Sequence, residues 1–194
     1  MYRERMETLK EWKVSKNRKP LIIRGARQVG KTWLMKEFGK LYYEKCAYIN
    51  FDNNSRMDIL FNEEFDLDRI IQGLKIESGI NIEPENTLII FDEIQETPKA
   101  LKTLKYFYEN ANEYHIVAAG SLLGVAMHQG TSFPVGKVNF MDLMPLSFFE
   151  FLDALGQEHL LNLLKNNEFL KKVMTRQGKN GILIYICLKG GSMP

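Results

Sequence analysis

Short apolar runs alternate with longer amphipathic stretches along most of this chain. The runs are four to six residues long and rich in residues that favour strands. In the stretches between them, apolar positions recur every three or four residues, which is typical of one face of a helix. The pattern predicts strands over residues 21–24, 46–51, 87–92, 115–119 and 138–143.

Helices are predicted between these strands and at both ends of the pattern. Turn-forming residues separate helix from strand at residues 15–20 and 52–55. Pro98 suits the first position of a helix, and Ser147 suits the N-cap of a helix that begins near Phe148. The other predicted helices cover residues 2–14, 31–44, 65–76, 98–112 and 158–174.

The alternation of strands with helices predicts the fold class. Strands joined by crossover helices pair in parallel, and residues 87–92 form the uninterrupted apolar run of a central strand covered on both faces. We therefore expect an α/β fold, a three-layer α/β/α sandwich with a mostly parallel sheet and the ligand at the carboxyl ends of its strands. The core is expected over residues 1–146, and residues 147–194 are expected to begin a helical lid or a C-terminal region.

Length, charge and cysteine content restrict the classes of protein to which this chain can belong. A chain of 194 residues suits one domain, or one domain plus part of a second. Its 26 Lys and Arg residues against 24 Asp and Glu residues give a formal charge of +2. This charge lacks the strong basic excess that is typical of nucleic-acid-binding proteins, but it does not exclude such binding. Cys46 and Cys187 lie in apolar surroundings, which favours buried thiols in a reducing compartment. Since no apolar run approaches the ~18 residues of a membrane span, a cytoplasmic protein is expected.

The octapeptide GARQVGKT, residues 25–32, matches the phosphate-binding pattern GxxxxGK(S/T) at every fixed position. It stands between a predicted strand and a predicted helix, which is the context that the motif requires. The N–H groups of such a loop turn inward as an anion nest, and the helix adds its positive end. Lys31 is then placed to reach the β and γ phosphates, and the Thr32 hydroxyl to ligate Mg²⁺. The predicted nucleotide contacts are Gly25, Ala26, Arg27, Gln28, Val29, Gly30, Lys31 and Thr32.

An acidic strand end supplies the second half of the predicted site. The run LIIFDE places Asp92 at the carboxyl end of a buried strand, where it is expected to hold Mg²⁺, directly or through water, opposite Thr32. Glu93 follows at once and is placed to orient and deprotonate an attacking water. The alternative is that Asp92 and Glu93 only cap the next turn. The loop and the acidic strand together favour ATP hydrolysis.

Two further polar residues carry weaker signals. Ser121 follows the predicted strand 115–119 and is expected to sense the γ phosphate, to cap the helix that follows, or both. Gln95 either helps to position water or is a solvated loop residue. The aromatic and methionine residues of the segment 140–151 fit packing in the core or in a lid.

Four separated blocks resemble, in the same order, the prokaryotic AAA-type ATP-binding proteins: GARQVGKT, LIIFDEIQ, AAGSLLG (118–124) and FPVGKVNFMDLMPLSFFEFL (133–152). In that group an AAA domain precedes a further C-terminal domain, and the resemblance covers about residues 2–152. It implies adenine in preference to guanine nucleotides, Lys31 and Thr32 as contacts of phosphate and Mg²⁺, Glu93 as base and Ser121 as sensor.

Members of that group usually continue well beyond the length of this chain, so the resemblance implies a truncated protein or a fragment. This leaves open whether the chain carries the lid arginine that AAA proteins commonly use against the γ phosphate. The leading hypothesis is a Mg²⁺-dependent ATPase module. The alternatives are a non-hydrolytic nucleotide switch and a DNA-associated ATPase, the latter motivated by the basic clusters at 16–19 and 99–105. Nucleic acid and further copies of the chain stay open as partners, and no membrane partner is expected.

Overall fold

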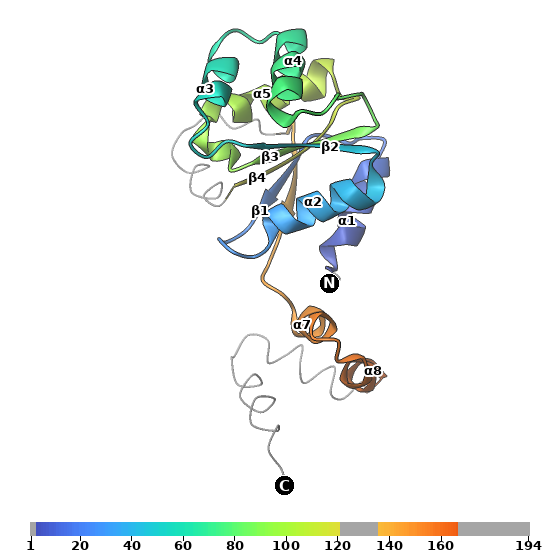
Figure 1. Cartoon of the computed structure of the whole chain (residues 1–194). Helices are drawn as coiled ribbons and strands as arrows, with labels where there is room; N and C mark the ends of the chain where they lie inside the picture. Colours follow the sequence, from blue (N-terminus) through green and yellow to red (C-terminus); the bar gives the residue numbers. More distant parts are fainter. Residues whose placement is uncertain (1–2, 121–135, 167–194) are drawn as a thin grey trace. The chain divides into compact units, whose positions relative to one another are not determined.

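The computed structural model describes residues 3–120 and 136–166. Residues 3–145 form one compact unit, and the described residues from 146 onward belong to a second. All strands lie in the first unit, where they form one sheet between two layers of helices (Figure 1). The five strands are β1 (Leu21–Arg24), β2 (Lys45–Asn50), β3 (Thr87–Asp92), β4 (His115–Gly120) and β5 (Asn139–Asp142).

The strands are arranged in the order β2-β3-β4-β1-β5, and every pairing between them is parallel. Strands β3 and β4 lie inside the sheet, and all six residues of each are buried. That burial accounts for their unbroken apolar runs, since both faces of a central parallel strand are covered by helices. The predicted three-layer α/β/α fold is confirmed.

Two helices cover one face of the sheet and three cover the other (Figure 1). Alternate residues of β3 point to opposite layers: Leu88 and Ile90 pack with the first pair of helices, and Ile89 and Phe91 with the other three. By the same alternation, Asp92 points to the layer of Ile90. The first layer contains α1 (Arg5–Val14) and α2 (Lys31–Tyr42), and the second contains α3 (Ser55–Asn62), α4 (Leu67–Ser78) and α5 (Pro98–Asn110).

Helix α3 has no counterpart among the predicted elements. The sequence indicates only a turn after β2, but Asn54 is the N-cap of α3, and its side chain accepts a hydrogen bond from the Met57 backbone N–H at 3.3 Å. Residues that favour turns also favour N-caps, so the two are easily confused. The helix is only eight residues long and buries Met57 and Phe61 alone, which leaves a weak periodic signal.

The second unit contains α7 (Phe148–Ala154) and α8 (Glu158–Asn166). The predicted cap at Ser147 is confirmed, because the Ser147 hydroxyl accepts from the Glu150 N–H at 3.2 Å and the Glu150 carboxylate accepts from the Ser147 N–H at 2.8 Å. The predicted helix 158–174 begins as expected, and its part beyond residue 166 lies outside the described residues. None of the described helices is long and apolar enough to cross a membrane.

Candidate functional site

The loop of residues 25–30 connects β1 to α2 at the carboxyl edge of the sheet. Its two glycines are required for different reasons. A Cβ at Gly25 would collide with the Leu143 carbonyl oxygen beyond β5, so the backbones could not approach so closely. Gly30 is the N-cap of α2 and has a φ of 90°, which a side chain would strain. Gln28 adopts a second left-handed conformation, with a φ of 63°. Such changes of hand turn backbone N–H groups toward one concave side, which suits an anion.

Lys31 begins α2, and its ammonium lies across the loop. Its side chain is buried, with only 6% of the residue exposed, and Nζ donates to the carbonyl oxygens of Gly25 at 2.9 Å and Ala26 at 2.7 Å. Burial lowers the pKa of Lys31, and the nearby carboxylates of Glu93 and Asp92 oppose that shift. The loop therefore holds a cation against neutral carbonyl groups.

Thr32 and Asp92 meet beneath this loop. The Thr32 hydroxyl, in the first turn of α2, donates to Asp92 Oδ2 at 2.6 Å. Asp92 ends β3 and is 4% exposed, and its Oδ1 accepts the Glu93 backbone N–H at 3.2 Å. A hydroxyl that donates a hydrogen bond to a carboxylate keeps the lone pairs of its own oxygen available for another partner. The structure thus brings together the two residues that the sequence predicts as metal ligands.

Tyr48 is a member of this cluster that no sequence motif indicates. Its hydroxyl donates to the same Asp92 Oδ2 at 3.0 Å. Burial, followed by the charge of Asp92, raises the pKa of Tyr48 far above its ordinary value, so the phenol keeps its proton and remains a donor. Only the pairing of β2 with β3, which sets Tyr48 beside Ile90, could have placed it here.

Glu93 leaves the strand with a strained backbone. Its φ of 51° lies in the left-handed region, which costs a non-glycine residue about 1 kcal/mol. Glu93 is the N-cap residue of a short 3₁₀ helix, η1 (Ile94–Glu96), but its side chain makes no cap hydrogen bond to that helix. Capping therefore does not account for the Glu93 carboxylate.

Gln95 is directed at that carboxylate. Its amide Nε2 donates to Glu93 Oε2 at 2.6 Å and to Glu96 Oε1 at 3.2 Å. Because ionised carboxylates only accept hydrogen bonds, these two contacts determine which end of the amide faces them. The other end, Gln95 Oε1, is buried and has no hydrogen-bond partner within the described residues.

Lys31, Thr32, Glu93 and Gln95 border a cavity of about 650 Å³, a volume within the range of small-molecule sites. Loop residues and the acidic segment after β3 face each other across it. No group of three or more His, Cys, Asp or Glu side chains in the described ranges forms a metal cage. Mg²⁺ bound with a nucleotide needs only one or two protein ligands besides phosphate and water, so the Thr32 and Asp92 pair fits it. The lining residues are Arg27, Gln28, Gly30, Lys31, Thr32, Trp33, Asp52, Glu93, Gln95 and Glu96.

Four of the predicted residues that the structure describes are not among these lining residues: Gly25, Ala26, Val29 and Asp92. Val29 is buried in the core between the sheet and α2. Ser121, predicted as the sensor of the γ phosphate, lies outside the described residues, directly after β4.

Comparison with known proteins identifies a family for this chain. A family model described as an AAA domain matches residues 17–152, which include the loop and the acidic strand end. No curated protein matches the sequence. A solved Walker-type ATPase of Pyrococcus abyssi is similar, with 16% identity and a TM-score of 0.50 over 92% of this chain and 68% of that one. The Orc1 protein of Aeropyrum pernix, solved in complex with DNA, has 13% identity and a TM-score of 0.47 over 81% of this chain and 50% of that one.

Proposed function

We propose that this chain, which belongs to the AAA domain family, binds ATP together with Mg²⁺ and hydrolyses the ATP. The observation that carries the proposal is the Thr32 to Asp92 hydrogen bond of 2.6 Å beneath the phosphate-binding loop. It joins the start of the helix after β1 to the end of β3, and Lys31 and Glu93 border the same cavity.

The loop and Lys31 would bind the phosphates. In the described structure the Lys31 ammonium donates to two neutral carbonyl oxygens. Phosphate oxygens are charged acceptors, and hydrogen bonds between ionised groups are about twice as strong as neutral ones. Lys31 would therefore exchange carbonyl for phosphate partners, while the inward N–H groups of the loop and the N-terminus of α2 hold the remaining oxygens.

Thr32 and Asp92 would hold the cation. The Thr32 hydroxyl donates a hydrogen bond to Asp92, so its oxygen lone pairs would be available to the metal, and Asp92 would contribute its charge directly or through water. When bound, Mg²⁺ would neutralise negative charge that develops on the phosphate oxygens.

Glu93 would activate water. The water oxygen forms a bond to the γ phosphorus, the bond from that phosphorus to the bridging oxygen of ADP breaks, and the Glu93 carboxylate takes the proton of the water. Gln95 would assist, because its amide N–H donates to the Glu93 carboxylate and holds it in place. Both residues line the cavity.

A calorimetric titration tests the proposal. ATP, ADP and GTP would be titrated with Mg²⁺ and with EDTA, and phosphate release would then be measured on the same sample. We expect ATP and ADP to bind more tightly than GTP, Mg²⁺ to tighten ATP binding, and phosphate to accumulate. Absence of ATP binding would refute the site. Binding without turnover above background would instead support the non-hydrolytic switch.

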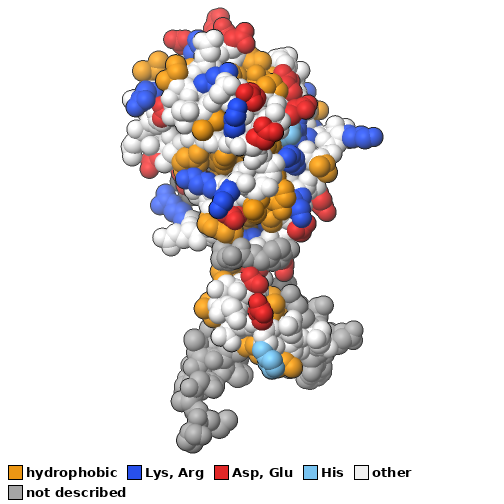
Figure 2. Space-filling view, turned by 45° about the vertical axis from the view of Figure 1, so that its right-hand side comes forward, with side chains coloured by type: hydrophobic (Ala, Val, Ile, Leu, Met, Phe, Trp, Pro, Cys, Tyr) orange, Lys and Arg blue, Asp and Glu red, His pale blue; other side chains and the backbone are white. Residues whose placement is uncertain are grey.

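A DNA-associated ATPase has less support from the described surface. On the face seen in Figure 2, Lys and Arg side chains are interspersed with Asp and Glu. Binding to the phosphate backbone of DNA depends on several neighbouring cations, and that face offers no field of a single sign. The face seen in Figure 2 therefore gives no support to a nucleic-acid partner.

A further inference from the structure

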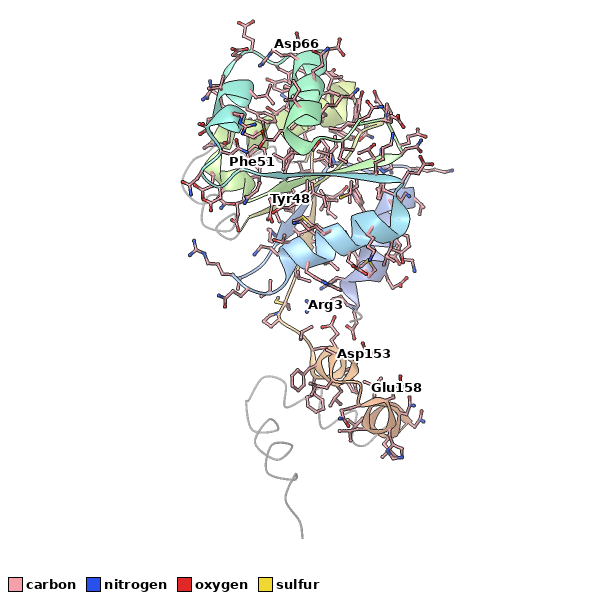
Figure 3. The ribbon with its side chains drawn as sticks, viewed as in Figure 1. Arg3, Tyr48, Phe51, Asp66, Asp153 and Glu158 are labelled. Atoms are coloured by element: carbon pink, nitrogen blue, oxygen red, sulfur yellow. The ribbon has the colours of Figure 1, made fainter. Side chains whose placement is uncertain are left out.

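Tyr48 connects the acidic strand end to a second contact on α2. Its hydroxyl donates to Asp92 Oδ2 at 3.0 Å, and the Lys36 ammonium lies 3.5 Å from the centre of its ring. Tyr48 lies on the α2 side of β2, whereas Phe51 belongs to the core of the opposite layer (Figure 3). Four side chains, Lys36, Tyr48, Asp92 and Thr32, thus form a continuous set of contacts, which we call the Tyr48 clamp.

The geometry of the clamp follows from strand register and helix periodicity. Tyr48 pairs with Ile90 in the register of β2 and β3, and Asp92 is two residues further along, on the same face. Thr32 and Lys36 are four residues apart on α2 and therefore share one face of that helix. One helix face consequently supplies both outer members of the clamp, and the sheet supplies the two inner members.

The Asp92 carboxylate receives two hydroxyl donors on one oxygen. Without Tyr48 the carboxylate would be held by the Thr32 hydroxyl on Oδ2 and by the Glu93 backbone N–H, which donates to Oδ1 at 3.2 Å. Tyr48 adds a second donor to Oδ2, from another strand, and so further restrains the orientation in which Asp92 accepts the hydrogen bond of Thr32. That orientation matters because the oxygen lone pairs of Thr32 are available to a cation only while the Thr32 hydroxyl hydrogen points at Asp92.

We propose that Tyr48 is a positioning residue for the cation: it holds Asp92 in the orientation that makes Thr32 and Asp92 a metal-binding pair. The proposal rests on the proposed Mg²⁺-dependent nucleotide binding. Groups that orient metal ligands typically change metal affinity by about tenfold or more when they are removed. A purely structural role for Tyr48 predicts no selective effect on the metal.

The experiment compares Tyr48→Phe with the wild-type chain and with Tyr43→Phe. The Tyr43 hydroxyl also makes a partly buried hydrogen bond, to His115 at 2.7 Å, but it contacts neither Asp92 nor Thr32. Binding of a non-hydrolysable ATP analogue would be measured by calorimetry in EDTA and over a range of Mg²⁺ concentrations. For Tyr48→Phe we expect the half-saturating Mg²⁺ concentration to rise about tenfold. Its affinity for the analogue in EDTA should stay within about twofold of wild type. Tyr43→Phe should match wild type in both measurements.

Three other results would overturn the inference, and they are distinguishable. If Mg²⁺ has no effect on wild-type binding, the proposed metal-dependent function fails and this inference fails with it. If wild type responds to Mg²⁺ and Tyr48→Phe responds equally, only the positioning role is refuted. If Tyr48→Phe lowers the affinity for the analogue by the same factor in EDTA as in Mg²⁺, the hydroxyl acts on the fold or on the loop and not on the cation. Thermal unfolding of both variants would show whether either has lost its structure.

Discussion

The two edges of the sheet hold buried polar side chains in different surroundings. At the amino edge, His115 Nδ1 and the Tyr43 hydroxyl lie 2.7 Å apart, and the rings of Tyr43 and Trp12 both meet the His115 ring edge to face. The indole N–H of Trp12 donates to the Lys19 carbonyl at 2.7 Å. These contacts pair polar groups with one another inside a packed cluster.

At the carboxyl edge, polar groups are also buried, but they face a cavity. Lys31 is bound to carbonyl groups of its own loop, Glu93 has a strained backbone, and Gln95 Oε1 is unpartnered within the described residues. Strain and unsatisfied polar groups lower stability, so their concentration at one edge indicates that a ligand completes the interactions there. Buried polar groups that pair with one another therefore do not by themselves indicate a functional site, whereas a buried charge and a strained residue beside a cavity indicate a candidate one.

Glu93→Gln should have the largest effect on the carboxyl edge. The amide cannot accept the proton of an attacking water, so we expect phosphate release to fall by about a hundredfold or more while ATP affinity stays within severalfold of wild type. Steady-state phosphate release and a nucleotide titration measure the two quantities. Glu96→Gln is the matched control, because Glu96 also accepts from Gln95 and borders the cavity. Equal turnover in Glu93→Gln and wild type would remove Glu93 from the mechanism.

At the amino edge, a pH change should alter stability without involving the site. Burial and the charges of Arg18 and Lys13 lower the pKa of His115 to about 4 from its ordinary 6.5. Because the folded-state pKa is depressed, the unfolded chain binds the proton first as the pH falls. Stability is then lost between pH 6.5 and 4, by about 3 kcal/mol in total. Urea unfolding of wild type and His115→Asn across this range measures the loss.

The two proteins should differ in how steeply their free energy of unfolding changes with pH. His115→Asn has no imidazole to protonate, so its free energy of unfolding should fall less steeply between pH 6.5 and 4 than that of wild type. Parallel pH profiles would show that His115 is already protonated or exposed in the folded chain, and the contrast between the two edges would then be lost.

Lys31→Ala should weaken nucleotide binding. A hydrogen bond to a charged group contributes about 1.5–3 kcal/mol, so we expect ATP affinity to fall by about tenfold to a hundredfold. Lys40→Ala removes an exposed lysine from the last turn of the same helix and is the control. Calorimetric titration of both variants tests the prediction. Unchanged affinity in Lys31→Ala would mean that phosphate does not enter the loop.

Sequence reasoning predicted the core of the fold and of the candidate site because those features are local. The loop glycines, Lys31 and Thr32 lie within one octapeptide, and Asp92 ends an apolar run of the kind expected of a central parallel strand. In a parallel sheet the carboxyl ends of strands share an edge, so two distant motifs could be placed together. The predicted parallel sheet is confirmed, while the roles of the site residues stay predictions.

Features that depend on register or on side-chain orientation could not be predicted. Tyr48 joins the site only through the pairing of β2 with β3, which the sequence does not specify. Gln95 was interpreted either as a water-positioning residue or as a solvated loop residue, because the sequence does not tell which way its amide faces. Helix α3 was missed because its N-cap has the composition of a turn.

Gln95→Leu should have the smallest effect among these changes, and it separates stability from activity most clearly. Leucine removes the N–H that holds Glu93 and also the unpartnered buried oxygen, so we expect turnover to fall by about tenfold. The free energy of unfolding should stay within about 1 kcal/mol of wild type or rise, because an unsatisfied buried acceptor has been eliminated. Phosphate release and urea unfolding measure the two quantities on one preparation. If stability falls together with turnover, Gln95 is a structural residue of the turn after β3 and not a residue that positions Glu93.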